Sequence, residues 1–333
     1  MNLDFIEGQM LEGAETRGGD TKVIEANAEA VVAQRLYRCK VRRRRVGQVL
    51  LDEGLAKTEG LDGVEALQAA LADFDPALVA QRCGIDAELL QASARQLAGA
   101  GNAAILLAYG LPYQGLNQEL ATAAANLALL TGIAGREGSG LYLCGEKANS
   151  QGAIDLGILP QGNGLGARAM LAAAVDGKMD ALYVVAEDPL SSYPDRDSVA
   201  KALEQVPFLV VQDLFLSPTA EQADVVFPAA SFAEKDGSFT NTERRVQRVR
   251  KAIDPPGLAW DDWKICCEIA TRMGYPMAYD NSRQIMEELS SVTPSYAGIS
   301  YARIEHEGIH WPCPTAAHPG TPILHRDQFS RRK

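Results

Sequence analysis

Residues 180–228 contain three short apolar runs separated by helical stretches. The runs are DALYVVAEDP (180–189), PFLVVQD (207–213) and DVVFP (224–228), and each is typical of a buried strand. Between them lie SVAKALEQV (198–206), which has a helical pattern, and the shorter SPTAEQA (217–223). Strands that alternate with helices form right-handed crossovers in a mainly parallel sheet. The segment therefore predicts an α/β protein with an open αβα sheet.

The pattern continues toward the N-terminus. AAILLAYG (103–110) is another apolar run, residues 117–131 predict an amphipathic helix, and residues 63–101 are helical with a break at Asp75-Pro76. After residue 228 we expect a turn with an exposed, charged strand, a helix over 258–274 and an irregular tail rich in Pro, Gly and His. The overall prediction is a Rossmann-like sheet followed by an irregular α+β part.

These elements predict three regions. Residues 1–112 are predicted to be a truncated remainder of an αβ domain, residues 113–228 an αβ ligand-binding domain, and residues 229–333 the irregular C-terminal part. A length of 333 residues is ample for more than one core.

Composition excludes several classes of protein. The chain has 32 basic and 43 acidic side chains and a net charge of −11, which argues against nucleic-acid binding. A basic run, RCKVRRRR (38–45), is interpreted as a solvated face, with phosphate or nucleic-acid contact as the alternative. No apolar run approaches the ~20 residues of a membrane span, and the first residues contain no apolar secretion signal. We therefore expect a cytoplasmic protein without a membrane span.

Cysteine and histidine spacing does not predict a metal site. The six cysteines are scattered and none forms a C-x-x-C pair, so buried, reduced thiols are expected. His306 and His310 have the i, i+4 spacing of zinc ligands on a helix. Gly308 and Pro312 argue against a helix there, so zinc remains only an alternative.

Polar residues follow the predicted strands where parallel sheets bind ligands, beyond the carboxyl ends. The first run delivers Gly110, followed by Tyr113 and Gln114. The second ends in Glu187-Asp188-Pro189, and the third in Gln212-Asp213, followed by Ser217 and Thr219. Carboxylates there suit ribose hydroxyls, and hydroxyl groups at a helix start suit phosphate. This pattern indicates a nucleotide-type ligand; alternatively, Asp213 and Ser217 only cap the next helix.

Several longer stretches resemble successive segments of molybdopterin-dependent oxidoreductases. They are ANLALLTGIAGREGSG (125–140), GEKANSQGAIDLGILP (145–160), VVAEDP (184–189) and FLVVQDLFLSPTAEQADVVFPAASFAEKDGSFTNTERRVQ (208–247). The later stretches DWKICCEIATRMGYPM (262–277), TPSYAGISYARIEHEGIHWPCP (293–314) and HPGTPILHRDQF (318–329) are similar to the formate dehydrogenase alpha subunit. The resemblance runs from about Leu67 to Phe329.

The resemblance implies a bis-molybdopterin guanine dinucleotide with molybdenum or tungsten, a 4Fe–4S cluster, and oxidation of formate to carbon dioxide. Carried over by position, it implies that Gly110 and Gln114 lie near the pterin. Glu187, Gln212, Asp213 and Ser217 would surround the guanosine and phosphates, with Asn149 and Asp224 as further members. Residues 113–228 would then be the domain that binds the pterin dinucleotide.

The sequence also departs from this family. It contains no cysteine motif for the 4Fe–4S cluster, and no histidine precedes His306 to follow a metal-bound Cys or selenocysteine. The family's last domain would begin after Phe329. We therefore expect the middle portion of a larger catalytic subunit, inactive alone and associated with a companion polypeptide or other subunits of an electron-transfer complex. The alternatives are a structural domain like that of the large peripheral-arm subunit of respiratory complex I, or an inactive fragment.

Overall fold

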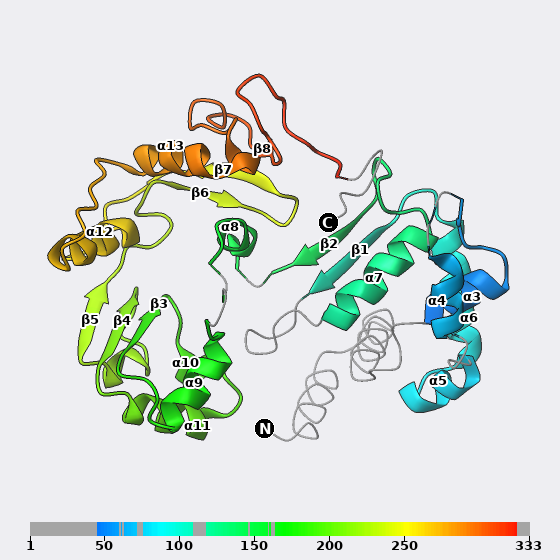
Figure 1. Cartoon of the computed structure of the whole chain (residues 1–333), viewed down its shortest axis with the longest axis horizontal. Coiled ribbons are helices and arrows are strands. Elements are labelled where there is room, and N and C mark those ends of the chain that lie inside the picture. Colours follow the sequence, from blue (N-terminus) through cyan, green and yellow to red (C-terminus); the bar gives the residue numbers. More distant parts are fainter. Residues whose placement is uncertain are drawn as a thin grey trace, which may run out of the picture. The chain divides into compact units, whose positions relative to one another are not determined.

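The computed structural model describes residues 45–59, 61, 63–71, 76–108, 118–145, 147–158, 160 and 164–324. These residues fall into two compact units. The first contains residues 45–107 and 118–143, and the second contains Ala108 and residues 144–324. Figure 1 shows the helices and strands of both units. In the described ranges, no helix is long and apolar enough to cross a membrane.

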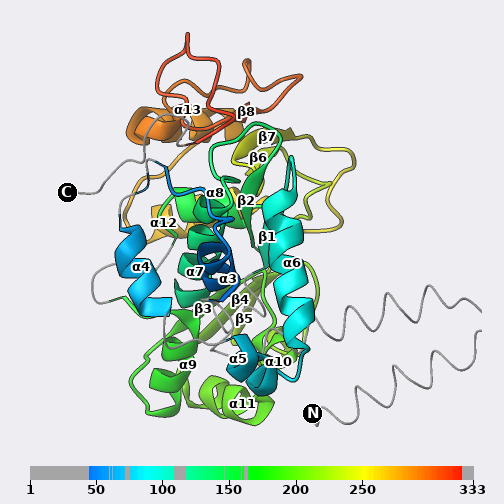
Figure 2. The same cartoon turned by 90° about the vertical axis from the view of Figure 1, so that its right-hand side faces the viewer.

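The first unit is mainly helical. Its helices are α3 (Arg45–Asp52), α4 (Val64–Leu71), α5 (Pro76–Cys83), α6 (Ala87–Gly99) and α7 (Gln118–Leu130). Its two strands, β1 (Ala104–Ala108) and β2 (Gly140–Cys144), pair with each other. The core contains Val49 and Leu50 of α3, Ala94 of α6 and Leu130 of α7. Figure 2 shows these three helices side by side. The predicted strand over 103–110 is thus confirmed as β1, in a sheet separate from β3–β5.

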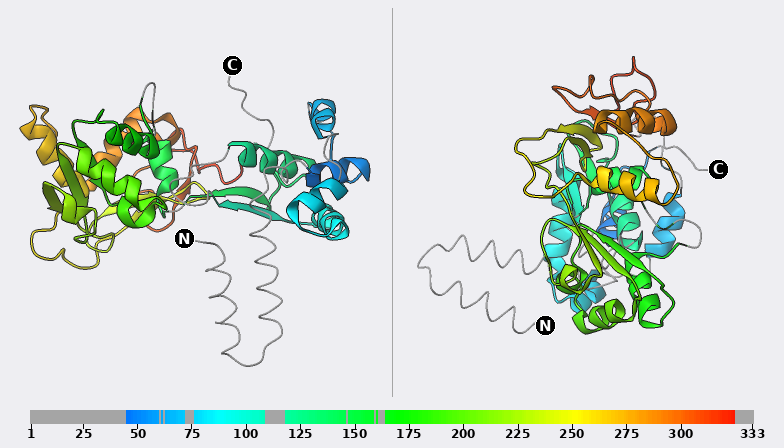
Figure 3. Two further views of the ribbon diagram at one scale, coloured as in Figure 1. Left: turned by 90° about the horizontal axis from the view of Figure 1, so that it is seen from below. Right: turned by 90° about the vertical axis from the view of Figure 1, so that its left-hand side faces the viewer.

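The second unit contains the predicted parallel sheet. Its strands β3 (Leu182–Val185), β4 (Leu209–Asp213) and β5 (Val225–Pro228) are parallel in the order β3-β4-β5. Helices α9 (Ala167–Val175) and α11 (Arg196–Gln205) lie beside this sheet (Figure 1, Figure 3). Their apolar side chains pack against those of β3 and β4. The short α10 (Pro189–Ser192) and η3 (Ala220–Gln222) follow β3 and β4. The predicted α/β class with an open, parallel sheet is confirmed.

The rest of the second unit is α+β. Strands β6 (Gly237–Thr240), β7 (Arg245–Val249) and β8 (Ile309–His310) form an antiparallel sheet, so the predicted exposed strand is in fact a hairpin. The remaining helices are α8 (Ser150–Asp155), α12 (Asp262–Arg272), α13 (Ser282–Val292) and η4 (Pro294–Tyr296).

The tail packs onto this antiparallel sheet through one apolar cluster. The buried members of the cluster are Val246, Met286, Tyr296, Ile299, Tyr301, Ile304, Ile309 and Cys313. Arg244, in the turn between β6 and β7, donates hydrogen bonds to the carbonyl oxygens of Trp311, Thr321 and Pro322. These contacts explain how a tail with little regular structure is held in place.

Candidate functional site

The carboxyl ends of β3 and β4 lie side by side and bring four predicted site residues to one edge of the sheet. The Ala186 N–H donates to the Gln212 carbonyl oxygen at 2.8 Å, which aligns the two strand ends. Glu187 follows at the end of β3, while Gln212 and Asp213 end β4 and Ser217 lies in the next loop. We call this the strand-end edge.

Ala186 has an unusual backbone conformation at this edge. Its φ is 51°, in the left-handed region that favours glycine. Such conformations cluster at functional sites, where the surrounding structure holds them. Here the turn leads directly from β3 into Glu187 and the start of α10.

Asp188 ties the loop after β3 to the loop after β4. Its Oδ1 accepts the Thr219 backbone N–H at 3.2 Å and the Thr219 hydroxyl, and its Oδ2 accepts the Ser191 hydroxyl. Burial alone raises the pKa of Asp188, but the hydrogen bonds from Ser191 and Thr219 outweigh it and hold the pKa below its usual value. Asp188 was not among the predicted site residues, although it follows Glu187 in the same strand-end pattern.

Gln212 is buried completely and connects the sheet to α12. Its Oε1 accepts the Tyr183 hydroxyl, and its Nε2 donates to Asp262 Oδ1 at 2.6 Å. The other oxygen of Asp262 pairs with Lys235 Nζ. Burial raises the pKa of Tyr183, and electrostatic interactions with Cys266 and Asp262 raise it further, so the phenol stays protonated and acts as a donor.

Asp262 therefore joins the strand-end edge, although the sequence analysis did not select it. It stands 50 residues from Gln212 and opens an apolar-periodic helix, where an acidic residue is expected for capping alone. Only the fold brings the two side chains together.

Asp213 and Ser217 make local contacts of the kind that caps a turn. Asp213 Oδ1 accepts the Leu214 N–H at 2.7 Å, and Oδ2 accepts the Ser217 hydroxyl at 3.4 Å. Ser217 Oγ in turn accepts a hydrogen bond from the Ala220 N–H at 3.4 Å. Both residues are half-buried, and a carboxylate has about four acceptor positions, so Asp213 retains capacity for a ligand.

The Glu187 carboxylate, like that of Asp213, can accept further hydrogen bonds from a ligand. Its Oε1 accepts the Ser192 hydroxyl at 2.6 Å, and its Oε2 lies 3.9 Å from Lys147 Nζ. The Lys147 side chain is 70% exposed, so this ion pair is weak and exchangeable.

Asn149 lies elsewhere in the second unit, before α8. Its Oδ1 accepts the Thr240 N–H of β6 at 2.8 Å. At the other end of α8, Asp155 Oδ2 accepts the Tyr296 hydroxyl at 2.7 Å, and that hydroxyl lies 2.8 Å from Thr240 Oγ1. These contacts hold α8 against the antiparallel sheet. Asn149 is thus held by β6, and its predicted role toward the cofactor stays a prediction.

The structure does not bring Asp224 to the strand-end edge. Asp224 Oδ2 accepts the Leu209 N–H at 2.7 Å, where β4 and β5 begin. At ~3.3 Å per residue, the strand from Leu209 to Asp213 places Asp224 on the order of 13 Å away, at the opposite edge. Gly110 and Gln114 lie outside the described residues.

The strand-end edge suits a nucleoside better than a metal ion. Its carboxylates belong to Glu187, Asp188, Asp213 and Asp262, and its hydroxyls to Ser191, Ser192 and Ser217. Carboxylate oxygens accept hydrogen bonds from ribose hydroxyls and from the N–H groups of guanine. Across the described ranges, no three His, Cys, Asp or Glu side chains gather as metal ligands. The edge therefore fits the nucleoside end of the dinucleotide cofactor that the resemblance implies.

Comparisons with known proteins agree on the family to which the chain is similar. The family model described as molybdopterin oxidoreductase matches residues 50–272. The alpha subunit of the F420-dependent formate dehydrogenase of Methanocaldococcus jannaschii is 39% identical over 313 residues, which cover 84% of this chain and 46% of that protein. Formate dehydrogenase H of Escherichia coli is 33% identical over 327 residues, 85% of this chain and 45% of that protein.

A solved structure shares the fold. Acetylene hydratase from Pelobacter acetylenicus superposes with a TM-score of 0.62 at 17% identity, over 80% of this chain and 43% of that one. The chain thus spans about half the length of the curated relatives it matches.

Proposed function

The chain belongs to the molybdopterin oxidoreductase family, and we propose that it is the portion of a formate dehydrogenase catalytic subunit that binds the guanosine end of a molybdopterin guanine dinucleotide. The observation that carries the proposal is the gathering of carboxylates at the strand-end edge, within the residues that match the family. Two formate dehydrogenases of different organisms support the substrate class.

Each group at the strand-end edge has a role in this proposal. Asp213 and Glu187 accept hydrogen bonds from the ribose hydroxyls, because both retain free acceptor positions. Asp262 accepts from guanine N–H groups while Gln212 and Lys235 hold its carboxylate in place. When bound, the cofactor supplies the molybdenum or tungsten centre at which formate is oxidised to carbon dioxide.

The proposal includes a companion polypeptide. No histidine precedes His306 in the sequence, and no cysteine pair has the spacing of a 4Fe–4S motif. In this proposal the metal-bound Cys or selenocysteine, the histidine and the cluster lie outside these 333 residues, and the chain works together with other subunits of an electron-transfer complex. Three of the relatives are themselves described as alpha subunits.

Guanine-nucleotide binding tests the proposal. GDP is titrated into the full chain by calorimetry, and we expect Asp213→Ala to weaken binding about tenfold through the lost charged hydrogen bond. Asp176→Ala is the matched control, since Asp176 is an exposed carboxylate at the end of α9 that pairs with Lys178. Loss of GDP affinity in the control variant, or equal affinity of Asp213→Ala and the wild type, contradicts the assignment.

Elemental analysis provides a second test on the chain purified from its native cell. Near-stoichiometric molybdenum or tungsten supports an occupied pterin site, and iron alongside it indicates that the companion polypeptide has co-purified. Absence of both molybdenum and tungsten contradicts cofactor binding in the cell.

A further inference from the structure

A cavity of about 540 Å³ lies in the second unit, and none of the predicted cofactor residues lines it. Its walls come from the base of the β6–β7 hairpin, the start of α12 and the start of α13. Organic ligands occupy pockets of ~300–1,000 Å³, so the volume is far larger than an inorganic ion requires. The cavity therefore has the size for a small organic molecule.

The lining is cationic in a protein that is strongly acidic. Five Lys or Arg side chains and three Asp side chains line the cavity, whereas the whole chain has a net charge of −11. Lys251 pairs with Asp254, and Arg283 pairs with Glu287, through side chains that are 39% and 66% exposed. Exposed pairs of this kind contribute little, so both cations can turn to an anionic ligand at small cost. The charge balance favours an anion.

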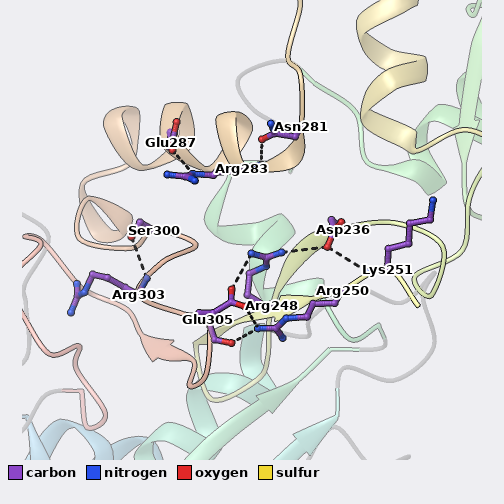
Figure 4. A network of polar contacts seen from close by, with 10 residues as sticks. All are labelled: Asp236, Arg248, Arg250, Lys251, Asn281, Arg283, Glu287, Ser300, Arg303 and Glu305. Atoms are coloured by element: carbon purple, nitrogen blue, oxygen red, sulfur yellow. Dashed lines mark hydrogen bonds and ion pairs between the residues drawn. The ribbon is translucent and has the colours of Figure 1, made fainter. Parts of the chain in front are cut away.

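Arg248 supplies a fixed cation at the wall. Its side chain is only 13% exposed, and its guanidinium lies 3.8 Å from the centre of the Tyr301 ring. Its Nη atoms reach Asp236 at 3.3 Å and Glu305 at 3.5 Å, both long contacts, and Nε is buried without a hydrogen-bond partner in the described residues (Figure 4). Buried donors normally form hydrogen bonds, so the Nε–H of Arg248 is a donor that can bind a ligand.

Aromatic side chains form the other part of the lining. Trp260 is 51% exposed where it borders the cavity, and Trp263 lies beside it at the start of α12. A flat indole face accepts a stacked ring, and base–aromatic stacking tolerates any base. Arg283, at the start of α13, also lines the cavity, and Figure 4 shows it beside Glu287 of the same helix.

We propose that this cavity binds a small organic phosphate that carries a flat ring, the chemistry of a mononucleotide. The ring stacks on Trp260, and the phosphate lies among Arg248, Lys251 and Arg283. The inference goes beyond the proposed cofactor site, because Glu187, Asp213 and Asp262 do not line the cavity. Lys235, which pairs with Asp262, does line it and is the residue that the two sites share.

Titrations with the full chain test the ligand chemistry. The probes are AMP, which has both ring and phosphate, ribose 5-phosphate, which lacks the ring, and adenosine, which lacks the phosphate. We expect AMP to bind with quenching of tryptophan fluorescence, and each partial probe to bind at least about tenfold more weakly. Absence of AMP binding at millimolar concentration, or equal binding of a partial probe, overturns the proposal.

Variants locate the binding. We expect Arg283→Ala and Trp260→Ala each to weaken AMP binding by roughly tenfold. Arg272→Ala is the matched control. Arg272 forms an ion pair with Glu268, four residues away in the helix, as Arg283 does with Glu287. The Arg272 side chain is 77% exposed and does not line the cavity. Asp213→Ala separates the two sites, since it should leave AMP binding intact while weakening GDP binding. If Asp213→Ala weakens AMP binding and Arg283→Ala does not, AMP binds at the strand-end edge and the cavity assignment is wrong.

Discussion

Two residues other than glycine have left-handed backbone in the described part of the chain, Ala186 with φ 51° and Arg244 with φ 67°. This conformation costs an L-residue roughly 1–2 kcal/mol. Arg244 offsets the cost with hydrogen bonds to three carbonyl groups of the tail. Ala186 is exposed and has only a methyl group, so its side chain provides no compensation. Its conformation is imposed by the strand-end edge.

Ala186→Gly should therefore stabilise the protein. Glycine adopts the left-handed conformation without strain, and we expect the free energy of unfolding to rise by up to about 1 kcal/mol. The measurement is urea denaturation of both proteins. Ala181→Gly, at an exposed residue before β3 with ordinary φ, is the control and should lose about 0.5–1 kcal/mol. A loss of the same size in Ala186→Gly contradicts the strain argument.

Asp155 is a residue whose ionisation opposes folding. Burial raises its pKa above the usual value, although the hydrogen bonds from Tyr296 and Gln151, a contact with Trp311 and the charge of Arg244 oppose the shift. The folded state therefore binds the proton more tightly than the unfolded state, whose pKa is about 3.9. The stability that protonated Asp155 contributes is present below that pH and is lost as the pH rises through the folded pKa.

Asp155→Asn should remove this part of the pH dependence. The amide keeps an oxygen for the Tyr296 hydroxyl but carries no charge at any pH. We expect the variant to gain stability relative to the wild type as the pH rises from about 4 to 7, measured by urea denaturation at each pH. Asp176→Asn is the contrasting control, because the hydrogen bond and charge of Lys178 lower the pKa of Asp176. The control should change little relative to the wild type between about pH 4 and 7, because the stability from ionised Asp176 is already present above the unfolded pKa of about 3.9 and is lost only at lower pH. A gain of the same size in both variants would refute the assignment.

At the scale of elements, α6 depends on its N-cap. Asp86 Oδ1 accepts the backbone N–H groups of Glu88 at 2.6 Å and Leu89 at 3.1 Å. Asp86→Ala leaves both donors to water, and we expect a loss of about 1 kcal/mol in the free energy of unfolding. Asp86→Asn retains a capping oxygen and should lose much less. The free energies of unfolding of the three proteins are measured by thermal and urea denaturation. Equal losses in both variants would show that the charge of Asp86, and not its capping hydrogen bonds, stabilises α6.

Elements with a strong local pattern were predictable from the sequence. The apolar runs over 207–213 and 224–228 form β4 and β5. They were predictable because a strand that is buried in a parallel sheet has a nearly continuous apolar sequence. Helix α13 was not predicted, although Asn281 caps it by accepting the N–H groups of Arg283 and Gln284. That cap is a local signal, and it was available in the sequence.

The candidate site was predictable only in part, because its contacts join distant segments. Glu187 follows β3 and Asp213 ends β4, and both strands were predicted to be parallel, so their common edge was expected. The contact of Gln212 with Asp262 depends on how α12 packs. Asp224 came from the resemblance alone, and its place before β5 already indicates the other edge of the sheet.

At the scale of the whole molecule, the loop after β4 exposes three consecutive apolar side chains. Leu214, Phe215 and Leu216 are 43%, 78% and 67% exposed. Single exposed apolar residues are ordinary, but contiguous ones mark interaction surfaces. The loop begins beside Asp213, at the strand-end edge. This loop is therefore a candidate contact surface.

Replacing Phe215 and Leu216 with serine should reduce association of the chain. Because both side chains are exposed, the double variant should fold as stably as the wild type, to within about 0.5 kcal/mol. We expect lower binding of an apolar dye and a smaller mass in light scattering at high protein concentration. Met273→Ser, at an 81% exposed residue of the second unit, is the control for removing exposed apolar surface elsewhere. If the wild type stays monomeric and binds no dye, or if Met273→Ser has the same effect as the double variant, the loop is not an association surface. A selective effect of the double variant would instead direct the search for the companion polypeptide to the strand-end edge, where the guanosine site is proposed.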